Sequence, residues 1–92
     1  MNEYLFIGKI VGTHGIKGEV KLRVEYAGIK ELLKVNTNLY LSSKYLKKKI
    51  IKIRYHKRNY LVLFDEVDNI NQVLSLVGSS VYLKKDEIKE AI

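Results

Sequence analysis

The 92-residue sequence contains no cysteine, which excludes disulfide frameworks and thiolate metal sites and favours a cytoplasmic protein. No apolar run approaches the roughly 20 residues that a membrane-spanning helix requires. The N-terminal residues Met1, Asn2 and Glu3 lack the basic region of a secretory leader. We therefore expect a cytoplasmic protein without a membrane partner.

The amino-acid composition is typical of one soluble globular domain. Hydrophobic residues make up 47% of the chain and charged residues 29%, which is a folded rather than a disordered composition. A chain of this length buries most of its apolar side chains without a metal or a disulfide.

Positive charge is concentrated in one segment. The net charge is +7, and residues 44–58 hold eight basic and no acidic side chains, whereas residues 59–92 hold three basic and six acidic ones. This asymmetry favours an anionic partner for residues 44–58, with nucleic acid first and an acidic membrane surface second.

Four of the six glycines fall within residues 8–18, at and after the end of a predicted strand at residues 4–11 and before a second at residues 19–26. Gly12, Gly15 and Gly18 recur at every third position, which is typical of a shaped loop whose backbone adopts positive φ. Such a loop displays His14 and Lys17 outward. The spacing matches no nucleotide-binding glycine motif, and no helical pattern follows Gly18.

The rest of the chain consists of short elements separated by turns. Further strands are predicted at residues 39–41, 47–56, 60–64 and 80–83, and short helices at 28–35 and 68–77, the second with apolar Ile70, Val73, Leu74 and Val77. Six strands without a βαβ rhythm predict an all-β fold, a small six-stranded antiparallel β-barrel with two short helices.

The predicted strand at residues 47–56 has one core face and one cationic face. Ile51, Ile53 and Tyr55 are expected to point inward and Lys52, Arg54 and His56 outward. The outward cations suit RNA binding, but charge that protects a solvated strand edge is the alternative. The candidates for RNA or partner binding are His14, Lys17, Lys47, Lys48, Lys49, Lys52, Arg54, His56, Lys57 and Arg58.

Two smaller alternatives concern single side chains. His14 either bonds its own backbone in the turn or contacts RNA or protein. Among the tyrosines, Tyr26, Tyr60 and Tyr82 are assigned to the core. Tyr45 and Tyr55 are assigned there as well, with a role as platforms beside the basic strand left open.

No arrangement of side chains predicts catalysis. Asp65, Glu66 and Asp68 are carboxylates that solubilise a turn, although two of them facing a pocket would suit acid/base chemistry. His14 and His56 lie far apart in the sequence without neighbouring ligands. We expect a protein that is not an enzyme and that binds no metal or cofactor.

One contiguous run carries a family resemblance: Gly8-Lys9-Ile10-Val11-Gly12-Thr13-His14-Gly15-Ile16-Lys17-Gly18-Glu19-Val20-Lys21. It resembles, almost letter for letter, the opening of the RimM family of ribosome maturation factors. The hairpin at residues 54–67 and the helix and strand at residues 73–83 are similar to that family as well. The chain departs from the family pattern at residues 25–28 and in its second helix.

The resemblance implies a fold and a function. The N-terminal domain of the family is a six-stranded barrel of the type shared with translation factors, here residues 1–85, with residues 86–92 as the start of a linker or tail. The family assists assembly of the small-subunit head and 16S rRNA processing without chemistry of its own. Its implied partners are the immature small ribosomal subunit, 16S rRNA, and the nineteenth small-subunit protein, mainly through a C-terminal PRC-type barrel that this chain lacks. A generic RNA-binding β-barrel is the alternative.

Overall fold

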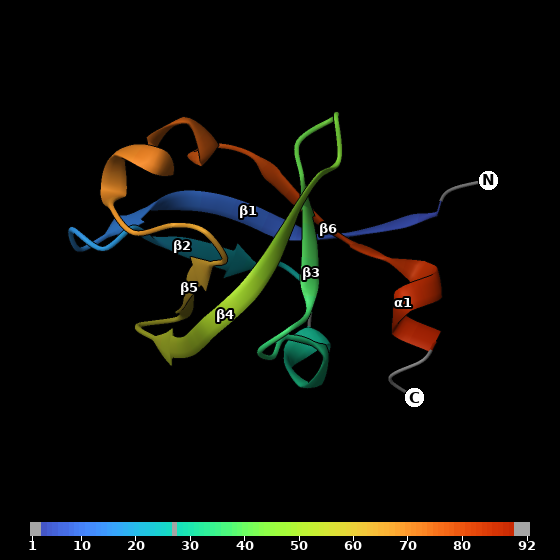
Figure 1. Cartoon of the computed structure of the whole chain (residues 1–92). Coiled ribbons are helices and arrows are strands. Elements are labelled where there is room, and N and C mark those ends of the chain that lie inside the picture. Colours follow the sequence, from blue (N-terminus) through green and yellow to red (C-terminus); the bar gives the residue numbers. More distant parts are fainter. Residues whose placement is uncertain (1–2, 27, 90–92) are drawn as a thin grey trace.

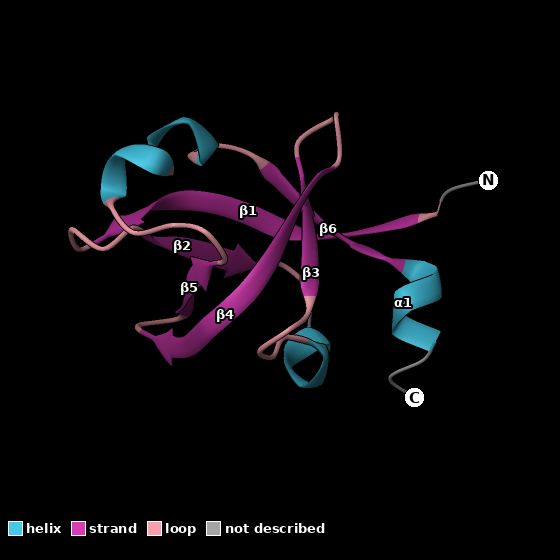
Figure 2. Ribbon diagram, in the orientation of Figure 1, coloured by secondary structure: helices cyan, strands magenta, loops and turns pink. Residues whose placement is uncertain are grey.

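A computed structural model describes residues 3–26 and 28–89 of the chain. Six antiparallel strands form a closed barrel in the order β1-β2-β5-β4-β3-β6 (Figures 1 and 2). The predicted all-β barrel of six strands is therefore confirmed. The strands are β1 (Tyr4–His14), β2 (Glu19–Val24), β3 (Asn38–Leu41), β4 (Leu46–His56), β5 (Asn59–Phe64) and β6 (Ser80–Lys84).

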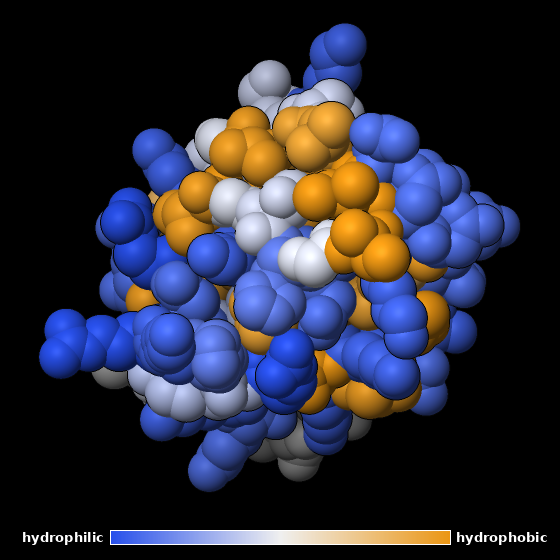
Figure 3. Space-filling view, turned by 90° about the vertical axis from the view of Figure 1, so that its left-hand side faces the viewer, coloured by the Kyte–Doolittle hydropathy of each residue, from blue (hydrophilic) through white to orange (hydrophobic). Residues whose placement is uncertain are grey.

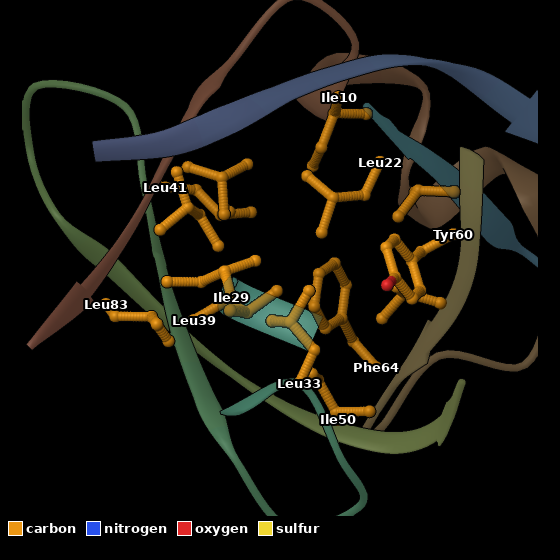
Figure 4. Packing of buried hydrophobic residues seen from close by; sticks show 14 of the residues in the cluster. Ile10, Leu22, Ile29, Leu33, Leu39, Leu41, Ile50, Tyr60, Phe64 and Leu83 are labelled. Atoms are coloured by element: carbon orange, nitrogen blue, oxygen red, sulfur yellow. The ribbon is translucent and has the colours of Figure 1, made fainter. Parts of the chain in front are cut away.

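The core of the barrel consists of branched aliphatic side chains together with Tyr60 and Phe64. Figure 4 shows Ile10, Leu22, Leu39, Ile50 and Phe64 pointing inward from five different strands. Ile29, from the 3-10 helix η1 (Ile29–Leu32), closes one end and is 2% exposed. Alternating inward and outward side chains along the strands thus point these apolar residues into the barrel.

The second predicted helix is broken into two 3-10 segments, η2 (Ile70–Gln72) and η3 (Leu74–Leu76). Asn69 caps η2, accepting a hydrogen bond from the backbone N–H of Asn71 at 2.9 Å. A 3-10 helix repeats every three residues, so the apolar positions chosen for an α-helix do not stay on one face. Val73 is buried, whereas Leu74 is 52% exposed and Val77 is 45% exposed. The predicted apolar face was therefore wrong at Leu74 and Val77.

A bulge in β4 corrects the predicted core face of that strand. The pairing of β4 with β5 shifts between Ile50 and Lys52, so Ile51 is the extra residue. Ile50 fills the core at 0% exposure, whereas Ile51 is 37% exposed. Beyond the bulge Lys52, Arg54 and His56 point outward as predicted.

Three tyrosines assigned to the core lie at the surface instead. Tyr26, which follows the end of β2, is 53% exposed, Tyr45 is 37% exposed and Tyr55 is 56% exposed. Tyr55 pairs with Tyr60 close to the turn between β4 and β5. Tyr60 is buried as predicted.

The glycine loop is shorter than predicted because β1 extends to His14. Gly12 lies within β1, opposite Lys21, and its φ is not positive, so it is not a loop glycine. Gly15 and Gly18 do adopt positive φ, 76° and 101°. The backbone N–H of Ile70 donates to the carbonyl of Ile16 at 2.9 Å, which holds the loop against η2.

The short helix α1 (Lys85–Lys89) follows β6, where a linker or tail was expected. The hydroxyl of Tyr40 donates to Oε2 of Glu87 at 2.7 Å. Burial and this hydrogen bond raise the pKa of Tyr40. Within the described residues, no helix has the length and hydropathy to cross a membrane.

Candidate nucleic-acid interface

The outer surface of four neighbouring strands, β1, β2, β5 and β4, gathers most of the predicted binding residues. Strand pairing places His14 beside Glu19, Lys21 beside Leu61, and Leu61 beside Arg54. Because these residues alternate with inward-pointing core residues, their side chains share one outward face. We call it the cationic face and define it by Lys9, His14, Lys17, Glu19, Lys21, Arg23, Lys52, Arg54, His56 and Lys57.

Leu61 lies at the centre of the cationic face. It points outward from β5, yet it is only 1% exposed. Its cross-strand neighbours are Lys21 and Arg54, whose aliphatic stems cover apolar surface while their charged ends stay in water. The charged ends of Lys21 and Arg54 therefore lie above a well-packed apolar side chain.

The two histidines, distant in sequence, meet on the cationic face. The rings of His14 and His56 have centroids 5.9 Å apart at an angle of 56°. Together with Lys21 and Lys57 they line a hollow of about 120 Å³. This arrangement favours the interpretation of His14 as a contact residue, because the ring lies among cations on the outer surface.

Glu19 is the one acidic member of the cationic face. Its Oε1 lies 3.6 Å from the Nη2 of Arg54, at a site where the Arg54 side chain is 56% exposed. An exposed pair of this kind contributes little stability. Lys17 and Lys52 line the same hollow as this pair, so Lys17 extends the cationic face to the glycine loop.

The tight turn between β4 and β5 ends the cationic face. Lys57 and Arg58 both adopt positive φ, 49° and 71°, as in a type I′ hairpin turn. Lys57 lines the histidine hollow, whereas Arg58 lines a different hollow beside Tyr26 and Tyr55. The turn therefore directs one cation to the outer face and one to the end of the barrel.

Lys47, Lys48 and Lys49 do not join the cationic face. They lie at the other end of β4, opposite β3, and line a hollow with the acidic residues Asp65 and Glu66. At about 3.3 Å per residue, Lys47 and His56 are roughly 30 Å apart along β4. The structure thus divides the predicted basic strand into two separate groups.

An apolar patch adjoins the cationic face across the glycine loop. It consists of Val11, Ile16, Leu74 and Val77, each between 40% and 82% exposed. Figure 3 views this end of the molecule and shows hydrophobic side chains gathered on its upper part above a hydrophilic lower part. Exposed apolar clusters of this kind mark contacts with proteins.

Three cations of the cationic face, Lys9, Lys21 and Arg23, were missing from the candidates drawn from the sequence, as was its one carboxylate, Glu19. The alternation of Glu19, Lys21 and Arg23 in β2 was visible in the sequence. What was missing is that β2 pairs with β5 and so lies beside the cations of β4.

The carboxylates considered for catalysis act in the turn after β5. The backbone N–H of Glu66 donates to Oδ1 of Asp65 at 3.0 Å. Within residues 3–26 and 28–89, no three side chains among His, Asp and Glu gather into a metal-binding group.

The sequence matches the profile of a known protein family. The sequence profile described as the RimM N-terminal domain matches residues 5–88. Among curated proteins, the ribosome maturation factor RimM of Lactobacillus gasseri is 35% identical over 98% of this chain and 53% of its own length. That of Leuconostoc mesenteroides is 36% identical over 88% of this chain and 48% of its own length. The chain spans about half the length of these relatives.

Solved structures share the fold. The N-terminal domain of RimM from Thermus thermophilus superposes with a TM-score of 0.77 at 18% identity, covering 95% of each chain. A 16S ribosomal RNA processing protein RimM from Pseudomonas aeruginosa gives a TM-score of 0.78 at 22% identity, over 91% of this chain and 52% of that chain.

Proposed function

The chain belongs to the RimM family through its N-terminal domain, and we propose that it acts as a ribosome maturation factor by binding RNA of the immature small subunit through its cationic face. The relatives are named for ribosome maturation, and one related structure for 16S rRNA processing.

The cationic face is the observation that carries this proposal. It presents its Lys, Arg and His side chains beside a single carboxylate, Glu19, on one rigid sheet surface. Cations in such an array neutralise successive backbone phosphates, and the counterions they release supply most of the affinity. The alternative, charge that protects a strand edge, does not account for Lys9 and Lys21, because β1 and β2 are paired on both sides at these positions.

The apolar patch favours a ribonucleoprotein particle over free RNA. A generic RNA-binding barrel would stack bases and track the backbone of any single strand. Here the cationic face and the apolar patch meet at Ile16, so a particle that presents RNA beside protein contacts both surfaces at once.

The finer assignments follow from family membership and remain part of the proposal. We place this domain on the head of the small subunit, in the cytoplasm, acting by binding and without catalysis. The contact with the nineteenth small-subunit protein is assigned mainly to the C-terminal domain that the full-length relatives carry.

A binding assay with three partners tests the proposal. The chain is mixed with immature small subunits, mature small subunits and an unrelated unstructured RNA, and the affinity for each is measured at one salt concentration. The proposal predicts a preference of at least about tenfold for immature subunits, which corresponds to roughly 1.4 kcal/mol. Equal affinity for all three would favour the generic RNA-binding barrel.

A further inference from the structure

A second feature, at the end of the barrel beside the β4–β5 turn, is a hollow bordered by two exposed aromatic rings. It has a volume of about 370 Å³, and Tyr26 and Tyr55 reach it from different parts of the chain. They are 53% and 56% exposed, although both phenol rings would bury favourably in the core. We call this feature the tyrosine hollow.

The ring of Tyr55 packs against the ring of a buried tyrosine, Tyr60. Tyr60, which is 8% exposed, packs against it edge to face, with ring centroids 5.1 Å apart at 69°. Pairing of Tyr55 with Tyr60 in the β4–β5 ladder fixes the backbone of both residues. Tyr55 therefore presents an exposed, preorganised ring.

The tyrosine hollow is also cationic. The Nζ of Lys30 lies 5.1 Å from the centre of the Tyr55 ring, and Arg58 lines the same hollow from the turn. Glu25 is the one acidic side chain among the lining residues. A flat aromatic ligand with an attached negative charge matches rings flanked by cations.

We propose that the tyrosine hollow binds an unpaired RNA base by stacking on Tyr55 and Tyr26, while Lys30 and Arg58 contact its phosphates. This inference rests on the proposed function, because the turn at Lys57 and Arg58 connects the hollow to the cationic face. Lys57 belongs to the cationic face, and Arg58, the next residue of the protein, lines the tyrosine hollow. An RNA strand bound along the cationic face therefore reaches the hollow where it passes this turn. Sequence-specific RNA recognition commonly reads such splayed bases on aromatic side chains.

A fluorescent base tests the proposal. The probe is a uridine dodecamer with one central 2-aminopurine, whose fluorescence is quenched on stacking, and its partner is the same RNA with an abasic site at that position. A purine stacks better than the surrounding uracils and so competes for the hollow. We expect the chain to quench the probe and to bind the abasic RNA roughly tenfold more weakly, the usual loss for one stacked base.

Variants assign the effect to the rings. Tyr55→Leu and Tyr26→Leu should each remove most of the quenching and weaken binding of the probe severalfold, and Tyr55→Phe should restore both because stacking needs the ring and not the hydroxyl. Tyr45→Leu is the matched control. It changes an exposed tyrosine ten positions earlier, just before the other end of β4, and should leave quenching unchanged.

The outcomes separate this inference from the proposed function. Equal, salt-dependent binding of probe and abasic RNA overturns the inference and leaves the cationic face in place. If Tyr55→Leu weakens binding to immature subunits while the two RNAs bind alike, the hollow holds a protein side chain and the inference is also overturned. If the chain binds neither of the two RNAs nor immature subunits, both the inference and the proposed function are overturned.

Discussion

Gly18 lies where the glycine loop packs against the segment after β5. Its φ is 101°, and a Cβ there would lie 2.5 Å from Cγ1 of Val67 and 2.8 Å from the carbonyl oxygen of Asn69. Gly18→Ala should therefore lower the free energy of unfolding by about 2 kcal/mol or more, through backbone strain and displacement of these neighbours. Urea unfolding of the purified variant measures the loss.

Gly12→Ala is the matched control for Gly18→Ala. A Cβ at Gly12 meets only the Cδ of Lys21 at 3.7 Å, an ordinary contact. The free energy of unfolding should change by no more than about 0.5 kcal/mol. Equal losses for the two variants would contradict the assignment of Gly18 as the constrained glycine.

Residue-scale prediction from sequence worked where the cause was local. Positive φ at Gly15 and Gly18 follows from a tight turn between two strands, which the sequence displays. Gly8 was not singled out, yet a Cβ there would collide with the backbone carbonyl oxygen of Arg23. That constraint depends on the close approach of β1 to β2, and it becomes visible only when the barrel is closed.

At the scale of single elements, the β4–β5 turn holds two large side chains at positive φ. Type I′ turns favour Asn-Gly, but this chain has Lys57 and Arg58 at positive φ, which is costly for side chains of this size. Replacing the pair with Asn-Gly should stabilise the domain by about 1 kcal/mol. Thermal melting should rise by about 5 °C for a domain of this size. Binding to RNA should weaken in the same variant.

A double substitution to glutamine separates the two effects of the turn. Lys57→Gln with Arg58→Gln removes both charges but keeps side chains at positive φ, so binding should weaken while melting stays unchanged. If the Asn-Gly variant melted at the wild-type temperature, backbone strain in the turn would be negligible. If it bound RNA as the wild type does, the two cations would not be contacts.

Elements were predictable in existence and type more than in detail. The alternation of Lys52, Arg54 and His56 predicted the outward side of β4, and the apolar pattern within residues 68–77 predicted a helical segment there. The bulge at Ile51 and the division into η2 and η3 were missed, because each depends on how the element closes against the rest of the barrel. Tyr26 and Tyr55 were placed in the core because a tyrosine in a strand is usually half-buried, whereas these two line a surface hollow beside η1.

At the scale of the whole molecule, the cationic face arises from strand order. Residues 44–58 carry eight positive charges in the sequence, but the structure sends Lys47, Lys48 and Lys49 toward Asp65 and Glu66. In their place Lys9, Lys21 and Arg23 join from β1 and β2. The sequence indicated the amount of positive charge, and the topology determines which of these charges lie on one face.

Two triple variants of equal charge test the central claim, that the cationic face binds RNA of the immature small subunit. One carries Lys21→Gln, Lys52→Gln and Arg54→Gln. The other carries Lys47→Gln, Lys48→Gln and Lys49→Gln. Glutamine keeps part of the apolar stem that covers Leu61, so both domains should remain folded, which melting curves check. Each triple lowers the net charge by the same amount, so total charge cannot distinguish them.

The measurement is the dependence of the affinity for immature subunits on salt concentration. Each phosphate contact contributes about 0.7–0.9 to the slope of log affinity against log salt, so the cationic-face variant should flatten that slope by about two. The variant at residues 47–49 should keep the wild-type slope. Identical slopes for the two variants, whether both flattened or both unchanged, would contradict the claim.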